Sequence, residues 1–284
     1  MLGVDGKHLR KHVTLSNPSR RGLSRASEAQ RPKGRGFPVR YFPYYIVPLP
    51  AYGELHIEWV VKATVVQKKR KIGLFGGTFN PIHLGHLRGA EEVRELCGLD
   101  EIIFIPAAIP PHKEAEEVIE ATHRLEMLRL AIKTNPRFSV STVEMERRGT
   151  SYSIDTIRFF LEKDQGTLSF VLGRDAFVEI ETWREYPTLF SLCSFIVMDR
   201  SGVGDLSRTE QLPKAISSAF QYDEGAKCWI HHSGQTVRFQ DITFLDISST
   251  QVRELIEKRQ SAKYLIPPEV ETYIQDHGLY RQRS

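Results

Sequence analysis

Two histidines in the stretch 73-GLFGGTFNPIHLGH-86 have the type and spacing to do chemistry. His83 and His86 are three residues apart, so within a helix they would share one face. Gly76 and Gly77 precede them after a short apolar run and let the backbone approach a ligand closely. A helix that begins beside the histidines would present free N–H groups and its positive dipole end to an anion. The stretch therefore indicates donors to phosphate, with a two-histidine metal site and ordinary packing as alternatives.

Other phosphate and metal motifs fit this stretch poorly. A Walker A loop needs Gly-Lys-Ser/Thr after its glycines, and a dinucleotide fingerprint needs GxGxxG. No acid or cysteine follows the histidines nearby on the same helix face to complete a zinc site. We therefore expect no dedicated metal site. His231, His232 and the other histidines lack comparable surroundings, and we expect them at the surface.

The residues that follow alternate between short apolar runs and amphipathic helical patterns. Residues 84–96 have apolar residues at three-residue steps with charges between them, which predicts a helix. Further strands are expected at residues 101–106, 138–143, 167–173, 194–199 and within 236–246, and further helices from an N-cap at Thr122 to about 135, from an N-cap at Ser153 to 161, over 249–259 and over 267–277.

This alternation predicts an α/β domain. Its core would be a doubly wound, Rossmann-like sheet of mostly parallel strands with helices on both faces, followed by a small helical C-terminal portion. Ligands of such sheets bind beyond the carboxyl ends of the strands. The Gly-Gly turn after the first predicted strand, residues 72–75, lies at such an end.

Charge is distributed unevenly along the 284 residues. Residues 1–70 hold 14 Lys and Arg against four Asp and Glu, whereas the whole chain has a net charge of +4. The segment is rich in Arg, Ser, Gly and Pro and has no hydrophobic periodicity. We therefore expect a disordered basic arm, residues 1–70, and a folded domain at residues 71–284. A targeting peptide, a nucleic-acid-binding arm and a downstream start near residues 60–66 remain alternatives.

Composition also restricts where the protein works. Its three cysteines are far apart and form no CxxC pair, which indicates reduced thiols in a cytoplasmic protein. The most apolar stretch, residues 41–53, is too short and too rich in proline to cross a bilayer. No membrane association is expected.

Six further blocks place the opening stretch in a family pattern. They are 110-PPHK-113, 123-HRLEMLRLAI-132, 144-EMERRGTSYSIDTI-157, 172-LGRDAF-177 with Trp183, 246-DISSTQVR-253 and 264-YLIPPEVETYIQDHGLY-280. Together with 76-GGTFNPIHLGH-86 they resemble bacterial nicotinate-nucleotide adenylyltransferase, within the HxGH nucleotidyltransferase superfamily, over about residues 71–280. The opening stretch alone also admits pantetheine-phosphate adenylyltransferases and cytidylyltransferases, but the PPHK and TSY blocks disfavour these.

The resemblance implies an enzyme of NAD biosynthesis. It would transfer the adenylyl group of ATP to nicotinate mononucleotide, with deamido-NAD and pyrophosphate as products. The mononucleotide phosphate would attack the α-phosphorus in line without a covalent intermediate, a reaction that needs positioning and charge stabilisation above all. Mg²⁺ would arrive with the ATP phosphates.

Several alternatives stay open at this point. One is preference for nicotinamide mononucleotide, or dual specificity. A non-catalytic nucleotide-binding or nucleic-acid-associated protein is disfavoured because His83, His86 and Arg253 are intact. No stable nucleic-acid partner is expected, and homo-oligomer formation is left open.

The resemblance also implies roles for single residues. His83, His86 and Arg253 would be catalytic, with His86 facing the α-phosphate. The residues expected to bind ATP are Gly76, Gly77, Thr78, His83, His86, Gly173, Asp175, Ser249, Thr250 and Arg253, with Ser249 and Thr250 capping a helix. The residues expected to bind the mononucleotide are Lys113 at its phosphate and Thr150, Ser151, Tyr152 and Trp183 around its ring. Main-chain N–H groups of the TSY block would bind the nicotinate carboxylate. Two positions depart from the pattern: Asn80 stands where Asp is frequent, and Arg174 adds a charge beside the site.

Overall fold

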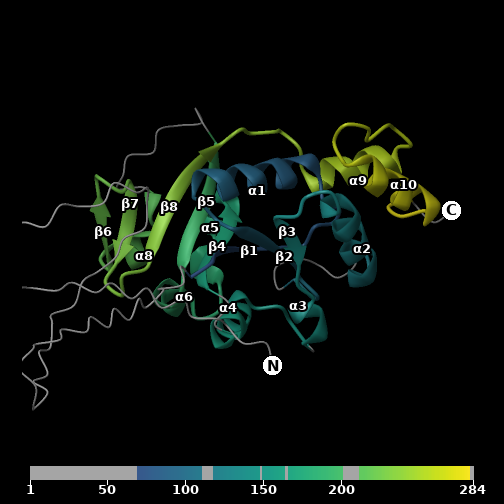
Figure 1. The fold of residues 1–284 in the computed structure, drawn as a ribbon. Helices are drawn as coiled ribbons and strands as arrows, with labels where there is room; N and C mark the ends of the chain where they lie inside the picture. The colour runs from purple at the N-terminus through teal and green to yellow at the C-terminus, as the bar shows by residue number, and fades with distance from the viewer. Residues whose placement is uncertain (1–68, 111–117, 148, 164–165, 201–210, 282–284) are drawn as a thin grey trace, which may run out of the picture. The chain divides into compact units, whose positions relative to one another are not determined.

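The computed structural model describes residues 69–281 apart from 111–117, 148, 164–165 and 201–210 (Figure 1). All described residues belong to one of the two units into which the chain divides, Ala63–Ser284. The predicted basic arm lies outside the described residues except for its last two, so it stays a prediction. No helix within the described ranges is long and apolar enough to span a bilayer.

Eight strands of the described chain form one sheet, in the order β3-β2-β1-β4-β5-β8-β7-β6. The strands are β1 (Lys71–Gly77), β2 (Glu101–Pro106), β3 (Phe138–Val140), β4 (Thr167–Gly173), β5 (Ser194–Arg200), β6 (Phe220–Asp223), β7 (Cys228–His231) and β8 (Thr236–Ile242). The first six in the sheet order pair in parallel, whereas β7 and β6 add an antiparallel edge. Because β2 lies on one side of β1 and β4 on the other, the topological switch point is at the carboxyl ends of β1 and β4.

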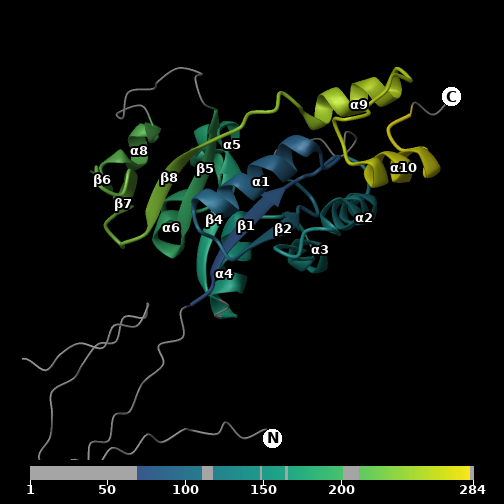
Figure 2. The ribbon, with the colours of Figure 1, turned by 45° about the horizontal axis from the view of Figure 1, so that its top comes forward.

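Helices cover both faces of this sheet (Figures 1 and 2). They are α1 (Leu84–Leu96), α2 (Ala121–Ile132), α3 (Val143–Glu146), α4 (Ser153–Glu162), α5 (Arg174–Val178), the 3-10 helix η2 (Ile180–Thr182), α6 (Tyr186–Leu192), α8 (Lys214–Ser217), α9 (Ser249–Glu257) and α10 (Pro268–Asp276). One apolar cluster packs α1, α2, α9 and α10 on one face, and a second packs α4, α5 and α6 on the other.

The strands contribute alternate side chains to these two clusters, as a pleated sheet buried on both faces must. In β1, Leu74 belongs to the cluster with α4 and Phe75 to the cluster with α1. The predicted doubly wound α/β class and the helical C-terminal portion are therefore confirmed.

Three predicted element boundaries are wrong. Thr122 and Ser153, expected as N-caps, lie inside α2 and α4, whose N-caps are Glu120 and Tyr152. Neither N-cap makes a side-chain hydrogen bond to its helix, so packing rather than capping fixes these two starts. The strand expected over residues 138–143 ends early because its last residue already begins α3.

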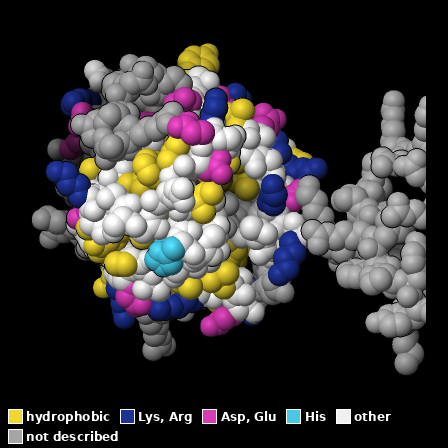
Figure 3. Space-filling model, turned by 90° about the vertical axis from the view of Figure 1, so that its left-hand side faces the viewer, with side chains coloured by type: hydrophobic (Ala, Val, Ile, Leu, Met, Phe, Trp, Pro, Cys, Tyr) yellow, Lys and Arg dark blue, Asp and Glu magenta, His cyan; other side chains and the backbone are white. Residues whose placement is uncertain are grey.

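The hairpin β6–β7 was not expected from the sequence, because each strand has only four residues and no clear alternation. Figure 3 views this end of the molecule, where apolar side chains lie among charged ones of both signs. His231 in β7 corrects another expectation, since it is buried rather than at the surface. Its Nδ1 lies 2.8 Å from Ser233 Oγ, and its ring packs against Phe220. His232 is exposed, as expected.

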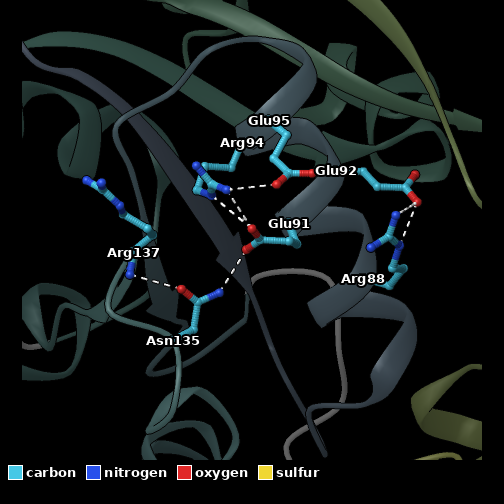
Figure 4. Close-up of polar contacts among 7 residues, drawn as sticks. All are labelled: Arg88, Glu91, Glu92, Arg94, Glu95, Asn135 and Arg137. Carbon is cyan, nitrogen blue, oxygen red and sulfur yellow. Dashed lines mark hydrogen bonds and ion pairs between the residues drawn. The ribbon is translucent and has the colours of Figure 1, made fainter.

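Two polar networks hold α1, the helix that begins at the opening motif (Figure 4). Glu91 accepts from Asn135 Nδ2 at 2.8 Å, which ties α1 to the segment before β3. On another side of the helix, buried Glu92 accepts from Arg88 Nε and from Thr243 N, both at 2.6 Å. Burial raises the pKa of Glu92, but these donors outweigh it and hold the pKa below its usual value. Helix α1 is thus also tied to the segment that leads from β8 to α9.

Candidate active site

The loop between β1 and α1 lies at the switch point and carries both candidate histidines. β1 ends in Gly76 and Gly77. A Cβ atom on Gly77 would lie 2.8 Å from the ring of Phe79, so the close approach of that ring requires glycine. Phe79 itself has a left-handed backbone, with φ of 48°, and the following Asn80–Pro81 peptide is cis. The loop is therefore a tightly packed turn that delivers the chain into α1.

The two histidines cap α1 reciprocally. His83 is the N-cap, and its Nδ1 accepts from His86 N at 3.4 Å. His86 is the third residue of the helix, and its Nδ1 accepts from His83 N at 3.3 Å. A neutral imidazole that accepts at Nδ1 carries its proton on Nε2. The reciprocal cap thus fixes both rings and makes Nε2–H the donor of each.

Burial decides the charge of this pair. The rings stack with centroids 3.6 Å apart at 28°, so two cationic rings would repel each other. His83 is only 6% exposed, and burial lowers its pKa to about 4. His86 is half-buried, with Phe75 and Phe79 against its edge. At neutral pH the site therefore contains at least one uncharged imidazole donor at a helix N-terminus.

Helix α9 brings a guanidinium to the same loop. Arg253 Nη1 donates to Asn80 O at 3.0 Å, and its Nη2 lies 3.4 Å from Thr250 Oγ1. Ser249 Oγ donates to Pro81 O at 2.9 Å. The start of α9 is thus tethered to Asn80 and Pro81, shortly before the histidine pair, although it lies about 170 residues further along the chain.

The expected cap of α9 is wrong. Ser248 is the N-cap, and its Oγ accepts from Gln251 N at 3.0 Å. Ser249 and Thr250 lie inside the first turn instead. The Ser249 hydroxyl is used to hold the histidine loop, which is a tertiary contact that no local pattern indicates.

Arg124 has no role predicted from the sequence, yet it is buried beneath this loop. The side chain is 1% exposed, and burial lowers its pKa. It donates to the carbonyl oxygens of Thr78 at 2.8 Å, Ala108 at 3.1 Å and Ile119 at 3.1 Å. No carboxylate in the described ranges forms an ion pair with it. Its position four residues before Leu128, on the apolar face of α2, is the sequence signal that could have identified it.

The end of β4 forms the other side of the switch point. Gly173 is the last residue of β4, and a Cβ there would meet no atom within 4 Å. Asp175 is exposed in the first turn of α5. Arg174 donates to Asp199 Oδ2 at 2.6 Å and lies over the ring of Phe239. The extra charge expected beside the site is therefore paired with a carboxylate at the end of β5.

The TSY block lies at the end of β2, and Ser151 is its anchor. Ser151 Oγ accepts from Ala108 N at 2.9 Å, and Ser151 N donates to Ile109 O at 3.0 Å. This N–H group is satisfied within the protein, which does not support the expected contact with a substrate carboxylate. Lys113, expected at the mononucleotide phosphate, lies outside the described residues.

Beneath the TSY block lies a buried carboxylate that was also missed. Glu144 accepts from Thr156 Oγ1 at 2.6 Å, and Arg147 Nη2 donates to the same hydroxyl at 3.0 Å. Burial raises the pKa of Glu144, while the hydroxyls of Thr156 and Ser151 oppose that rise. The network braces the block against α3 and α4.

Two aromatic side chains, Tyr152 of the TSY block and Trp183, pack against the same apolar cluster. Trp183 is half-buried and meets Phe170 edge to face, with ring centroids 5.9 Å apart. Tyr152 packs against the same apolar cluster, and the guanidinium of Arg184 lies 4.9 Å from its ring centre. Thr150, just before Ser151, is half-buried. Together these residues offer aromatic surface and backbone groups rather than charge.

The side of the site at the end of β1 is rich in hydrogen-bond donors. The loop after β1 gathers two imidazoles and the guanidinium of Arg253 beside the start of α9, and such donors suit phosphate oxygens. Within the described ranges, no group of three His, Cys, Asp or Glu side chains is placed to hold a metal ion.

Comparisons with known proteins agree with this arrangement. A family model described as cytidylyltransferase-like matches residues 74–255, which include both histidines and Arg253. A protein of Citrifermentans bemidjiense named "Probable nicotinate-nucleotide adenylyltransferase" is 47% identical over 211 residues, 74% of this chain and 98% of the relative. The chain belongs to the nicotinate-nucleotide adenylyltransferase family. A protein of the same name from Syntrophotalea carbinolica is 45% identical over 75% of this chain and 99% of its own length.

Solved structures of this family share the fold. The structure of Plasmodium falciparum nicotinic acid mononucleotide adenylyltransferase complexed with NaAD has a TM-score of 0.57 at 21% identity, over 74% of this chain and 97% of that chain. The same enzyme complexed with APC gives a TM-score of 0.56 at 20% identity. The predicted family, enzyme class and Rossmann-like fold are therefore confirmed.

Proposed function

We infer that this site transfers the adenylyl group of ATP to nicotinate mononucleotide, with deamido-NAD and pyrophosphate as products, as a step of NAD biosynthesis. Family membership supports the reaction. The observation that supports the site best is the reciprocal histidine cap, because it fixes two Nε2–H donors at the N-terminus of α1, on the loop that Arg253 also contacts.

His86 is proposed to face the α-phosphate, where negative charge develops as the mononucleotide phosphate attacks. Such a donor is preorganised, since its ring is already held by the backbone of His83. Removing one preorganised oxyanion-hole donor from a protease costs about 10²–10³ in kcat, and a loss on that order is expected here. His83, uncharged at neutral pH, would add a second donor without adding positive charge of its own.

The remaining phosphate contacts are proposed around these rings. The backbone of Gly76, Gly77 and Thr78 would approach the phosphates at the end of β1. On the side of α9, the proposed contacts to the β- and γ-phosphates are the guanidinium of Arg253 and the main-chain N–H groups of Ser249 and Thr250 in the first helical turn. Holding pyrophosphate there would stabilise the leaving group.

The adenosine of ATP and the acceptor mononucleotide are proposed to bind on the two sides of this phosphate site. Gly173 and Asp175 are proposed to bind the adenosine, since the space over Gly173 is open and Asp175 can accept from a ribose hydroxyl or the adenine edge. The nicotinate ring is proposed to lie between the TSY block and Trp183. Because Ser151 N is already satisfied, its neighbours Thr150 and Tyr152 are the proposed backbone donors to the carboxylate. Lys113 remains the proposed partner of the mononucleotide phosphate.

Mg²⁺ is proposed to enter as part of the substrate Mg-ATP. Hard cations of this kind prefer oxygen ligands, which the phosphates supply. The phosphate side of the described site offers mainly donors, which suits a metal carried by the nucleotide.

A parallel assay of pyrophosphate release tests the substrate assignment. The full chain is given Mg-ATP with nicotinate mononucleotide, nicotinamide mononucleotide or phosphopantetheine at equal concentrations. We expect the highest kcat/KM with nicotinate mononucleotide, because backbone donors favour a carboxylate over an amide. A higher value with nicotinamide mononucleotide would establish the alternative specificity, and a higher value with phosphopantetheine would refute a pyridine nucleotide as substrate.

A further inference from the structure

The last turn of the described chain contacts the histidine loop from a distance of 200 residues in the sequence. Tyr280 Oη donates to Asn80 Oδ1 at 2.8 Å. Asn80 is 1% exposed and lies three residues before His83. Burial raises the pKa of Tyr280, so its hydroxyl stays protonated and remains a donor at physiological pH.

The backbone of Tyr280 is unfavourable for a residue with a side chain. Its φ is 62°, in the left-handed region, shortly after Gly278 at 61°. Such conformations cost free energy and persist only where other contacts enforce them, often near functional sites. Here the Tyr280 ring packs against the apolar cluster that includes α1, α2, α9 and α10, and Leu279 N donates to Ile274 O at 3.0 Å. These contacts hold the hydroxyl on Asn80.

Asn80 connects this hydroxyl to the proposed phosphate groups. Its side-chain oxygen accepts from Tyr280, while its main-chain oxygen accepts from Arg253 Nη1 at 3.0 Å. A rotation of the Asn80 peptide would therefore move the guanidinium and the start of α1 together. Losses of alignment on the order of 1 Å can cost about 100-fold in rate when reacting groups must be held in line.

We propose that Tyr280 is a positioning residue for adenylyl transfer, which orients Asn80 and through it Arg253 and the His83–His86 pair. The proposal rests on the phosphate roles inferred above for these three residues. It gives the C-terminal segment a part in the reaction, although Tyr280 itself is not a proposed substrate contact.

The test compares two Tyr→Phe variants that each remove one hydroxyl from the C-terminal segment. Tyr273 Oη lies 3.0 Å from His123 Nδ1, between α10 and α2, and is the matched control. We expect Tyr280→Phe to lower kcat at least tenfold with KM for nicotinate mononucleotide within twofold. We expect Tyr273→Phe to keep kcat within twofold, although both variants should lower the melting temperature by similar amounts. Equal kcat values for the two variants would overturn the proposal.

A double-mutant cycle tests whether Tyr280 acts through Asn80. Leucine is nearly isosteric with Asn but accepts no hydrogen bond, so Asn80→Leu should have a low kcat. Adding Tyr280→Phe to this variant should lower kcat no further. Independent, multiplying losses would refute the coupling. If the Tyr280→Phe variant does not fold, the kcat of Asn80→Asp is compared with that of Asn80→Leu, because Asp keeps the side-chain oxygen that accepts from Tyr280. Equal kcat values for Asn80→Asp and Asn80→Leu would then reject the proposal.

Separate measurements test the proposed function itself. Normal turnover of Arg253→Ala would refute the phosphate role of Arg253, whatever Tyr280→Phe does. A slow Arg253→Ala beside a normal Tyr280→Phe would leave the site intact and reject only the positioning role.

Discussion

Two pairs of closely packed histidines occur in the described part of the chain, one in the loop after β1 and one at the end of β7, four strands further along the sheet order. The rings of His83 and His86 stack with centroids 3.6 Å apart at 28°, and those of His231 and His232 are tilted by 37° with centroids 3.8 Å apart. In each pair one ring is buried, and burial lowers its pKa. Ring separation and the burial of one member therefore do not distinguish the pairs.

Their surroundings do distinguish them. The first pair caps a helix at the switch point of a parallel sheet, next to the loop atoms that Arg253 contacts. The second pair lies at the end of a four-residue antiparallel strand, and His231 Nδ1 is engaged by Ser233. The phosphate role proposed for the first pair rests on these surroundings, a helix N-terminus and a nearby cation, and the second pair lacks them.

The largest expected difference between the pairs is in turnover. His86→Asn should lower kcat by about 10²–10³, because Asn can still accept from His83 N but has no donor at the Nε2 position. The matched change His232→Asn should leave kcat unchanged. Pyrophosphate release under saturating Mg-ATP and nicotinate mononucleotide measures both. A folded His86→Asn variant with near-normal kcat would show that the two pairs are functionally alike.

The next largest difference is in acid stability. The unfolded chain protonates His83 near pH 6.5, whereas the folded pKa is about 4. This contribution to stability is therefore complete above about pH 6.5 and is lost as pH falls to about 4, by up to about 3 kcal/mol. His83→Asn keeps a preferred N-cap residue and removes the titration. Urea unfolding at pH 7, 5 and 4 should show a smaller acid loss for this variant than for the parent chain.

The second pair provides the comparison for that measurement. Burial, followed by the neighbouring His232, also lowers the pKa of His231, so its contribution has the same sign. His231→Asn should likewise reduce the acid loss, but only His83→Asn should also slow turnover. An acid loss that is identical in the parent chain and His83→Asn would refute the buried neutral state of His83.

The smallest expected effect concerns the hydroxyls beside each pair. Ser249 Oγ donates to Pro81 O at 2.9 Å, and Ser233 Oγ lies 2.8 Å from His231 Nδ1. Ser249→Ala and Ser233→Ala should each cost about 1 kcal/mol of unfolding free energy. We expect only Ser249→Ala to lower kcat, by severalfold, since its hydroxyl holds the phosphate loop. Equal kcat values in the two variants would argue against a role for that tether in catalysis.

The sequence alone determined what depends on local geometry. The sequence indicated that His83 and His86 lie together at the start of a helix, but His83 is the extended N-cap rather than a helical residue, so a reciprocal cap and not a shared helix face pairs the rings. The alternation of apolar strands and amphipathic helices was sufficient to predict the fold class, because the hydrophobic period of a segment indicates which of its faces are buried. The short hairpin β6–β7 was not predicted, because four residues are too few to show a hydrophobic period.

Only the tertiary structure decided which distant residues support the site. Arg124, Ser249 and Tyr280 reach the β1–α1 loop across 46, 168 and 200 residues, and the charge of Arg174 is paired with Asp199. Such contacts depend on how helices pack on the two faces of the sheet. A local pattern can indicate that Arg124 is buried, but it cannot name the partners of these residues, since a polar side chain is satisfied only once the distant group that pairs with it is in place.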